Sequence, residues 1–139
     1  MARRYINWEL KLSDFLESRR DVHFAWGTHD CCMFAADAVR AITGIDPAEE
    51  FRGYSTKDEI RELFAEIGGV DALVAHCMHD HGFQECAPGF AKRGDVLIIN
   101  GPLGTTAGFV GMNGKPTAPK RIGYGQTNRN AAVRAWSVW

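Results

Sequence analysis

The sequence predicts an α+β fold, with helices in its first 82 residues and an antiparallel sheet in the remainder. Two observations carry this prediction. Apolar residues recur at helical spacing up to Gly82, and after Pro88 they form short runs separated by turns rich in glycine and proline. The length of 139 residues is that of one domain, so residues 1–139 are expected to form a single unit.

The composition indicates a globular protein without a membrane-spanning segment. Hydrophobic residues make up 45% and charged residues 24% of the chain, which excludes a disordered or fibrous protein. The apolar runs are too short to insert into a membrane, and the basic start lacks the apolar stretch of a signal peptide. The net charge of −1 argues against a nucleic-acid partner, because no basic surface is available to neutralise phosphates.

Capping signals and apolar spacing place the individual elements. Asp30 is a good N-cap and Gly44 a good stop for a helix over residues 31–43. The apolar face of this helix is built from mostly small residues, so we expect it to be central and to pack on the sheet. Further helices are expected over residues 8–20, 47–52, 56–67 and 70–81, and strands over 95–100, 105–112, 115–124 and 132–139.

The segment FAWGTHDCCMFAAD at residues 24–37 is the most informative in the chain. Cys31 is expected in the first turn of a helix, where unpaired N–H groups and the positive end of the helix dipole favour thiolate over thiol. A cysteine nucleophile is prepared in this way, and the aromatic loop before it would form a substrate wall. The alternative is that Cys31 is a small buried residue, since unpaired cysteines are often buried. Only four cysteines are present and two are adjacent, which indicates reduced thiols made inside a cell.

Two short motifs and the helix between them resemble the papain-like core of the NlpC-type cysteine peptidases. The motifs are Trp26-Gly27-x-x-Asp30-Cys31, before the helix, and Arg93-Gly94-Asp95-Val96-Leu97. These enzymes cleave peptide bonds in the bacterial cell wall. The resemblance spans residues 24–124 in the order and type of elements. It implies that Cys31 occupies the nucleophile position and that Cys32 stands where a serine is usual.

The sequence departs from this family at the catalytic base. The resemblance puts Thr106 where the base histidine belongs, and no histidine occurs after His81. A cysteine nucleophile needs a base within hydrogen-bond reach, held by a third group, which would come near Ala118. His29, on the loop that enters the helix, is an alternative base if that loop folds over the helix end. We prefer the interpretation that His29 and Asp30 hydrogen-bond the start of the helix.

A longer pattern resembles a narrower group of proteins. It consists of Trp-Gly-x-x-Asp-Cys-Cys-x-Phe-Ala-Ala-Asp-Ala and a closing Arg134-Ala135-Trp136. It is similar to small phage and prophage proteins that are usually encoded among tail-tip genes. This resemblance implies a structural or assembly protein of the tail tip on a degenerate NlpC-type fold. Its partners would be other tail-tip or hub subunits, and it would be made in the bacterial cytoplasm and located in the virion. The alternative is a cell-wall cysteine peptidase or amidase that uses Cys31 during phage entry.

A second cluster of reactive residues lies near residue 80. Five candidate zinc ligands fall within eleven residues: His76, Cys77, His79, His81 and Cys86. On a helix over 70–81 they divide between two faces, and the paired Cys-x-x-Cys that would be a strong zinc signal is missing. We therefore prefer a helix end with Cys77 in the core, and we expect neither a metal nor a cofactor.

Overall fold

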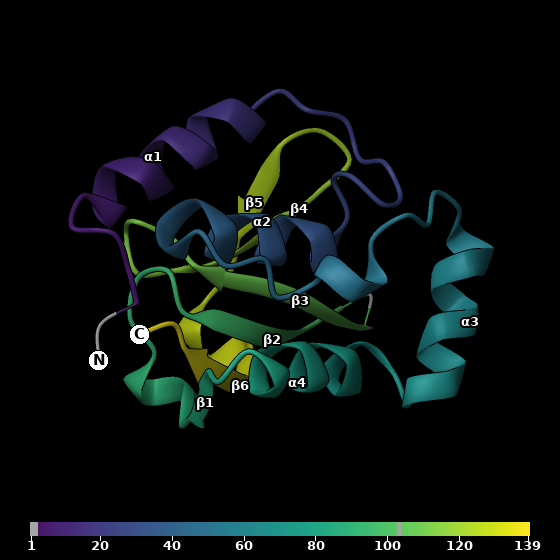
Figure 1. The fold of residues 1–139 in the computed structure, drawn as a ribbon. Helices are drawn as coiled ribbons and strands as arrows, with labels where there is room; N and C mark the ends of the chain where they lie inside the picture. Colours follow the sequence, from purple (N-terminus) through teal and green to yellow (C-terminus); the bar gives the residue numbers. More distant parts are fainter. Residues whose placement is uncertain (1–2, 103) are drawn as a thin grey trace.

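The computed structural model describes residues 3–102 and 104–139, which form four α-helices and a six-stranded antiparallel sheet (Figure 1). The helices are α1 Trp8–Arg19, α2 Cys31–Thr43, α3 Lys57–Ile67 and α4 Val70–Asp80. The strands are β1 Gln84–Cys86, β2 Val96–Gly101, β3 Gly104–Val110, β4 Pro116–Pro119, β5 Tyr124–Gln126 and β6 Ala132–Ser137, in the spatial order β1-β6-β2-β3-β4-β5. All five pairings are antiparallel, so the predicted α+β class is confirmed.

Helix α2 is central, as its small apolar residues predict, and it lies in front of the sheet between α1 and α4 (Figure 1). The Asp30 side chain accepts a hydrogen bond from the Met33 N–H, and Gly44 closes the helix in the left-handed conformation. The main core is formed by buried residues of these three helices and of the sheet: Leu12, Leu16, Phe34, Ala38, Val39, Ile42, Val74, Met78, Val96, Ile98, Phe109 and Trp136. The start of α2 is thereby fixed against the sheet.

Two smaller clusters complete the packing. One joins α2 to α3 and α4 and contains Cys32, Met33, Ile60, Leu73 and Cys77. The other covers the opposite face of the sheet, where Leu97, Ile99, Val110 and Ala135 are buried. Within the described residues, no helix has the length and apolar content that crossing a membrane requires.

Three elements differ from the sequence-based expectation. The single strand expected over 115–124 is two strands, β4 and β5, because the chain turns at Gly123, whose N–H donates to the Val22 carbonyl. Strand β1 was not predicted, since its three residues are only an edge strand and show no apolar alternation. The helix expected over 47–52 is reduced to a 3-10 turn over Glu49–Phe51.

A buried ion pair joins the beginning of the chain to its end. The Arg4 guanidinium contacts Asp95 Oδ1 at 2.8 Å and donates to the Val138 and Arg93 carbonyls at 2.6 and 2.7 Å. Asp95 also accepts from the backbone N–H groups of Lys92 and Val138. The guanidinium carbon lies 4.2 Å from the ring of Trp8 and 4.1 Å from the ring of Trp139. Asp95, the aspartate of the Gly-Asp motif, therefore links the segment before α1 to the segment after β6.

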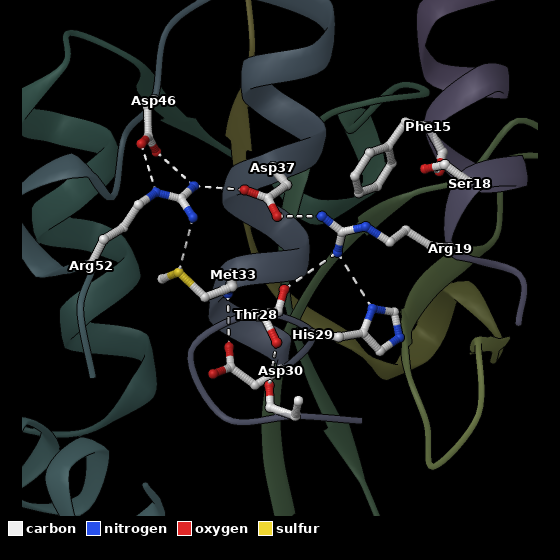
Figure 2. Close-up of polar contacts among 11 residues, drawn as sticks. Phe15, Ser18, Arg19, Thr28, His29, Asp30, Met33, Asp37, Asp46 and Arg52 are labelled. Carbon is white, nitrogen blue, oxygen red and sulfur yellow. Dashed lines mark hydrogen bonds and ion pairs between the residues drawn. The ribbon is translucent and has the colours of Figure 1, made fainter. Parts of the chain in front are cut away.

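A second ionic network ties the elements around α2 (Figure 2). Asp37 of α2 accepts from Arg19 of α1 on one oxygen and from Arg52 on the other, at 2.5 and 2.6 Å. Arg52 also contacts both carboxylate oxygens of Asp46. This network fixes α1 and the 46–52 segment to the same helix that carries Cys31.

Replacing Gly27 by alanine is expected to destabilise the protein by about 2–4 kcal/mol. Gly27 has a φ of +85°, and an added Cβ would lie 1.9 Å from the Tyr54 carbonyl oxygen. Gly53 is a matched control, because its φ is +115° but nothing lies within 4 Å of an added Cβ. Urea unfolding of the two variants separates the clash from the backbone strain, and equal losses of stability would contradict the close approach.

Candidate active site

Cys31 is the first residue of α2, and its half-buried side chain lies where the helix meets β3. The pKa of Cys31 is lowered to about 7, chiefly because the Cys32 thiol donates a hydrogen bond to it, and also because of hydrogen bonds from Thr106 and Ala107. Burial and the Asp30 carboxylate oppose this shift. The Cys31 thiol therefore loses its proton more readily than an ordinary cysteine.

The neighbouring Cys32 has the opposite character. Its Sγ lies 4.0 Å from Cys31 Sγ, and its side chain is buried in the cluster between α2, α3 and α4. The pKa of Cys32 is raised well above its ordinary value, first by its hydrogen bond to Cys31 and then by burial. Cys32 thus keeps its proton and Cys31 is the nucleophilic sulfur of the pair.

An apolar pocket of about 280 Å³ opens beside the two thiols. Its walls include Trp26 from the loop before α2, Tyr54, Ile60 and Phe64 from the α3 region, and Val70 from α4. The Phe24 ring packs edge-to-face against Trp26 and extends the aromatic wall toward solvent. The aromatic loop before α2 thus forms one wall of the pocket, and four of the nine lining residues come from the 54–70 segment.

Thr106, which the resemblance puts at the position of a base histidine, lies near enough to the Cys31 thiol to help lower its pKa. Thr106 lies on β3, with Ile99 as its partner on β2. It also lines a second pocket of about 220 Å³ that includes Ala118 of β4, the residue expected near the third catalytic position. A threonine hydroxyl hydrogen-bonds a thiolate but does not take up a proton near neutral pH.

His29 does not face the thiol. Its side chain is 1% exposed, and its Nε2 donates to the Gly123 carbonyl at 2.8 Å. Its Nδ1 lies 3.4 Å from the Arg19 guanidinium, which Asp37 holds in place (Figure 2). Both ring nitrogens are therefore engaged, and within residues 3–102 and 104–139 no hydrogen bond joins the Cys31 thiol to an imidazole. Of the two residues expected to hold the helix start, Asp30 caps it and His29 instead binds the 120–123 turn.

Tyr54 is a site residue that sequence reasoning missed. Its hydroxyl donates to Asp30 Oδ2, which also accepts from the Gly27 N–H at 2.8 Å. Burial and this hydrogen bond raise the pKa of Tyr54, so the phenol stays protonated. No local sequence pattern indicates Tyr54, because it lies 24 positions along the chain from Asp30.

A family model described as a domain of unknown function (DUF6950) matches residues 3–138. The chain belongs to the DUF6950 family. Neither a curated protein nor a solved structure matches the sequence. The match covers the whole described fold, so the Cys31 site lies within the DUF6950 domain.

In this DUF6950 chain the five candidate zinc ligands do not converge. His79 Nε2 accepts from the Trp136 indole at 3.0 Å, and His81 Nδ1 donates to the Cys77 carbonyl at 2.9 Å. Cys77 is buried in the core, as expected, and burial raises its pKa to about 12. Cys86 lies on β1, in the separate cluster on the far face of the sheet.

A different set of possible ligands, Glu50, His76 and Asp80, lies at the surface with its ligand atoms within 4.8 Å of one another. His76 Nε2 is 2.9 Å from Glu50 Oε1. Glu50 was not predicted, because it comes from the 3-10 turn that packs beside α4 rather than from the histidine-rich segment.

The Cys32→Ala variant of the DUF6950 chain is expected to slow alkylation of Cys31 by iodoacetamide at pH 6. With a pKa of about 7, about one tenth of Cys31 is thiolate at that pH, against roughly 0.3% for an ordinary cysteine. Removing the Cys32 donor raises the Cys31 pKa and moves the midpoint of the rate profile to higher pH. Cys86→Ser is the control and should leave the midpoint unchanged, and an unshifted midpoint in Cys32→Ala would exclude the thiol–thiol hydrogen bond.

Proposed function

We propose that this DUF6950 chain is a bacteriophage or prophage tail-tip protein with a papain-like, NlpC-type core, which acts in structure or assembly without catalysis. The observation that carries the loss of catalysis is that both ring nitrogens of His29 are engaged elsewhere, so that within the described residues no hydrogen bond joins an imidazole to the Cys31 thiol. The sequence motifs supply the tail-tip assignment. The central helix followed by an antiparallel sheet is the arrangement expected of such a core.

The chemistry of amide cleavage supports this proposal. A peptidase must protonate the leaving amine and then activate water, and both steps need a group that exchanges a proton near neutral pH. Thr106 offers a hydroxyl, and His29 is engaged by Arg19 and Gly123. Loss of an acid–base partner lowers the rate by typically ~10²–10⁴.

This proposal is tested in the phage that encodes the chain, by comparing the Cys31→Ala variant with a deletion of the whole gene. Particles with Cys31→Ala are expected to assemble and infect as the unmodified phage does, whereas deletion of the gene should leave tails incomplete. The protein should also copurify with intact tails. Normal tails in the deletion strain would overturn the structural role, and failed infection by Cys31→Ala alone would overturn the non-catalytic one.

The second candidate is a cell-wall cysteine peptidase or amidase that acts during phage entry. One observation favours it, namely a thiol with a pKa of about 7 beside an aromatic pocket. In this case the purified protein releases muropeptides from cell wall, and Cys31→Ala abolishes the release. A preparation that releases none at neutral pH, yet is fully alkylated at Cys31, supports the non-catalytic proposal instead.

A further inference from the structure

The Cys31 site has a nucleophilic sulfur and an apolar pocket, but within the described residues no group that transfers protons is hydrogen-bonded to the sulfur. A site of this kind can react only with carbonyl compounds whose leaving group departs without being protonated. An amide releases an amine that must be protonated as it leaves, for which the site has no donor. A thioester instead releases a thiolate, whose conjugate acid has a pKa of roughly 8.5, so it departs without a general acid. Thioesters are thus the carbonyl substrates that this thiol is equipped to attack.

The same deficiency determines the fate of an acylated sulfur. Hydrolysis of an acylated cysteine requires a base that activates water. Within the described residues the thiol of Cys31 is hydrogen-bonded to Cys32, and Thr106 and Ala107 are the other groups that help lower its pKa. None of these groups is a base near neutral pH. An acyl group transferred to Cys31 is therefore retained rather than turned over.

The pocket indicates which acyl group fits. Its volume of about 280 Å³ is many times the roughly 10–15 Å³ that one water molecule needs, so it has room for a chain of several carbon atoms. Ile60, Phe64 and Val70 make its walls apolar, so a hydrocarbon chain of medium length suits it better than a charged or short group.

We propose that Cys31 is a site of S-acylation, at which the sulfur accepts a medium-length apolar acyl group from a thioester and the adjoining pocket holds the chain. The Cys31 thiolate attacks the carbonyl carbon and forms a new C–S bond, with the oxyanion near the positive end of α2. The bond to the donor sulfur then breaks, and its electron pair leaves with the donor thiolate, which takes a proton from water. The step consumes no oxidant and no cofactor.

The experiment uses the full chain and the octanoyl thioester of N-acetylcysteamine, a small uncharged donor. At pH 7, intact mass spectrometry should show one octanoyl group per chain, which peptide mapping places on Cys31 and neutral hydroxylamine removes. Cys31→Ser should give no thioester adduct, whereas the matched control Cys86→Ser should be acylated normally. Acylation spread over several cysteines, or loss of the adduct by hydrolysis within minutes, would overturn the proposal.

A pocket variant tests the role of the cavity separately from the sulfur. Thr105 lines the pocket with an exposed side chain, so Thr105→Trp narrows the pocket without disturbing the core. Octanoylation should slow by about tenfold or more in this variant, while acetylation by the corresponding acetyl thioester should change little. Equal slowing of both donors would show that the cavity does not bind the chain. These results are independent of the tail-tip role, which is tested in the particle.

Discussion

The Asp95→Ala variant is expected to lose about 3–5 kcal/mol of folding free energy, because it leaves the buried Arg4 guanidinium without its counter-charge. Both side chains are at most 2% exposed, and burial lowers the pKa of Arg4 despite the opposing effect of Asp95. The variant also removes the acceptor of the Lys92 and Val138 N–H groups. A loss of this size is a large fraction of the stability of an ordinary domain.

Arg93→Ala is the matched control for this variant. Arg93 forms an ion pair with Glu9 at the surface, where both side chains are more than one-third exposed, so its removal should cost less than about 1 kcal/mol. The backbone carbonyl of Arg93 still accepts from Arg4 in this variant. Urea unfolding measures the free energy of unfolding of both variants. If Asp95→Ala is as stable as Arg93→Ala, the buried ion pair contributes little to stability.

The parts of the fold that sequence predicts well are those set by local hydrogen bonds. Asp30 was expected as an N-cap, and its side chain accepts from the backbone N–H three residues on, as that of Thr56 does at the start of α3. Gly44 ends α2 in the left-handed conformation, as expected, and Gly68 ends α3 in the same way. Each of these signals acts within one helical turn, so a short stretch of sequence contains all of its cause.

Features that depend on distant segments were missed. Strand β1 exists because Glu85 pairs with Trp136, and no apolar pattern in three edge residues indicates such a partner. The partition of 115–124 into β4 and β5 depends on a hydrogen bond between Gly123 and Val22 on a remote loop. Sequence separation, rather than weak propensity, limits the prediction at these places.

The candidate site shows the same division. The motif around Cys31 is recognisable in the sequence, and the structure puts this residue at the start of α2, as its N-cap Asp30 predicts. Tyr54 was not expected, because only the folded chain brings it to Asp30. The role of Asp95 was also not apparent, since its partner Arg4 lies 91 residues away.

Asp30→Ala is expected to cost about 3–7 kcal/mol, because one carboxylate accepts hydrogen bonds from three donors at the entrance to α2. Loss of the N-cap for the Met33 N–H accounts for about 1 kcal/mol, and the Gly27 N–H and the Tyr54 hydroxyl each lose a buried partner, at about 1–3 kcal/mol apiece. Asp30→Asn is the graded comparison, because asparagine caps a helix as well as aspartate but carries no charge. Its cost should therefore be smaller, as measured by urea unfolding.

The Asp30→Asn variant also separates stability from thiol reactivity, since the two should change in opposite directions. The negative charge of Asp30 raises the pKa of Cys31, so removing that charge lowers the pKa and increases the thiolate fraction at pH 6. Alkylation of Cys31 by iodoacetamide at pH 6 should then be faster, although the protein is less stable. Alkylation that slows together with the loss of stability would mean that Asp30 maintains the reactive thiol by holding the helix start, and that its charge contributes little.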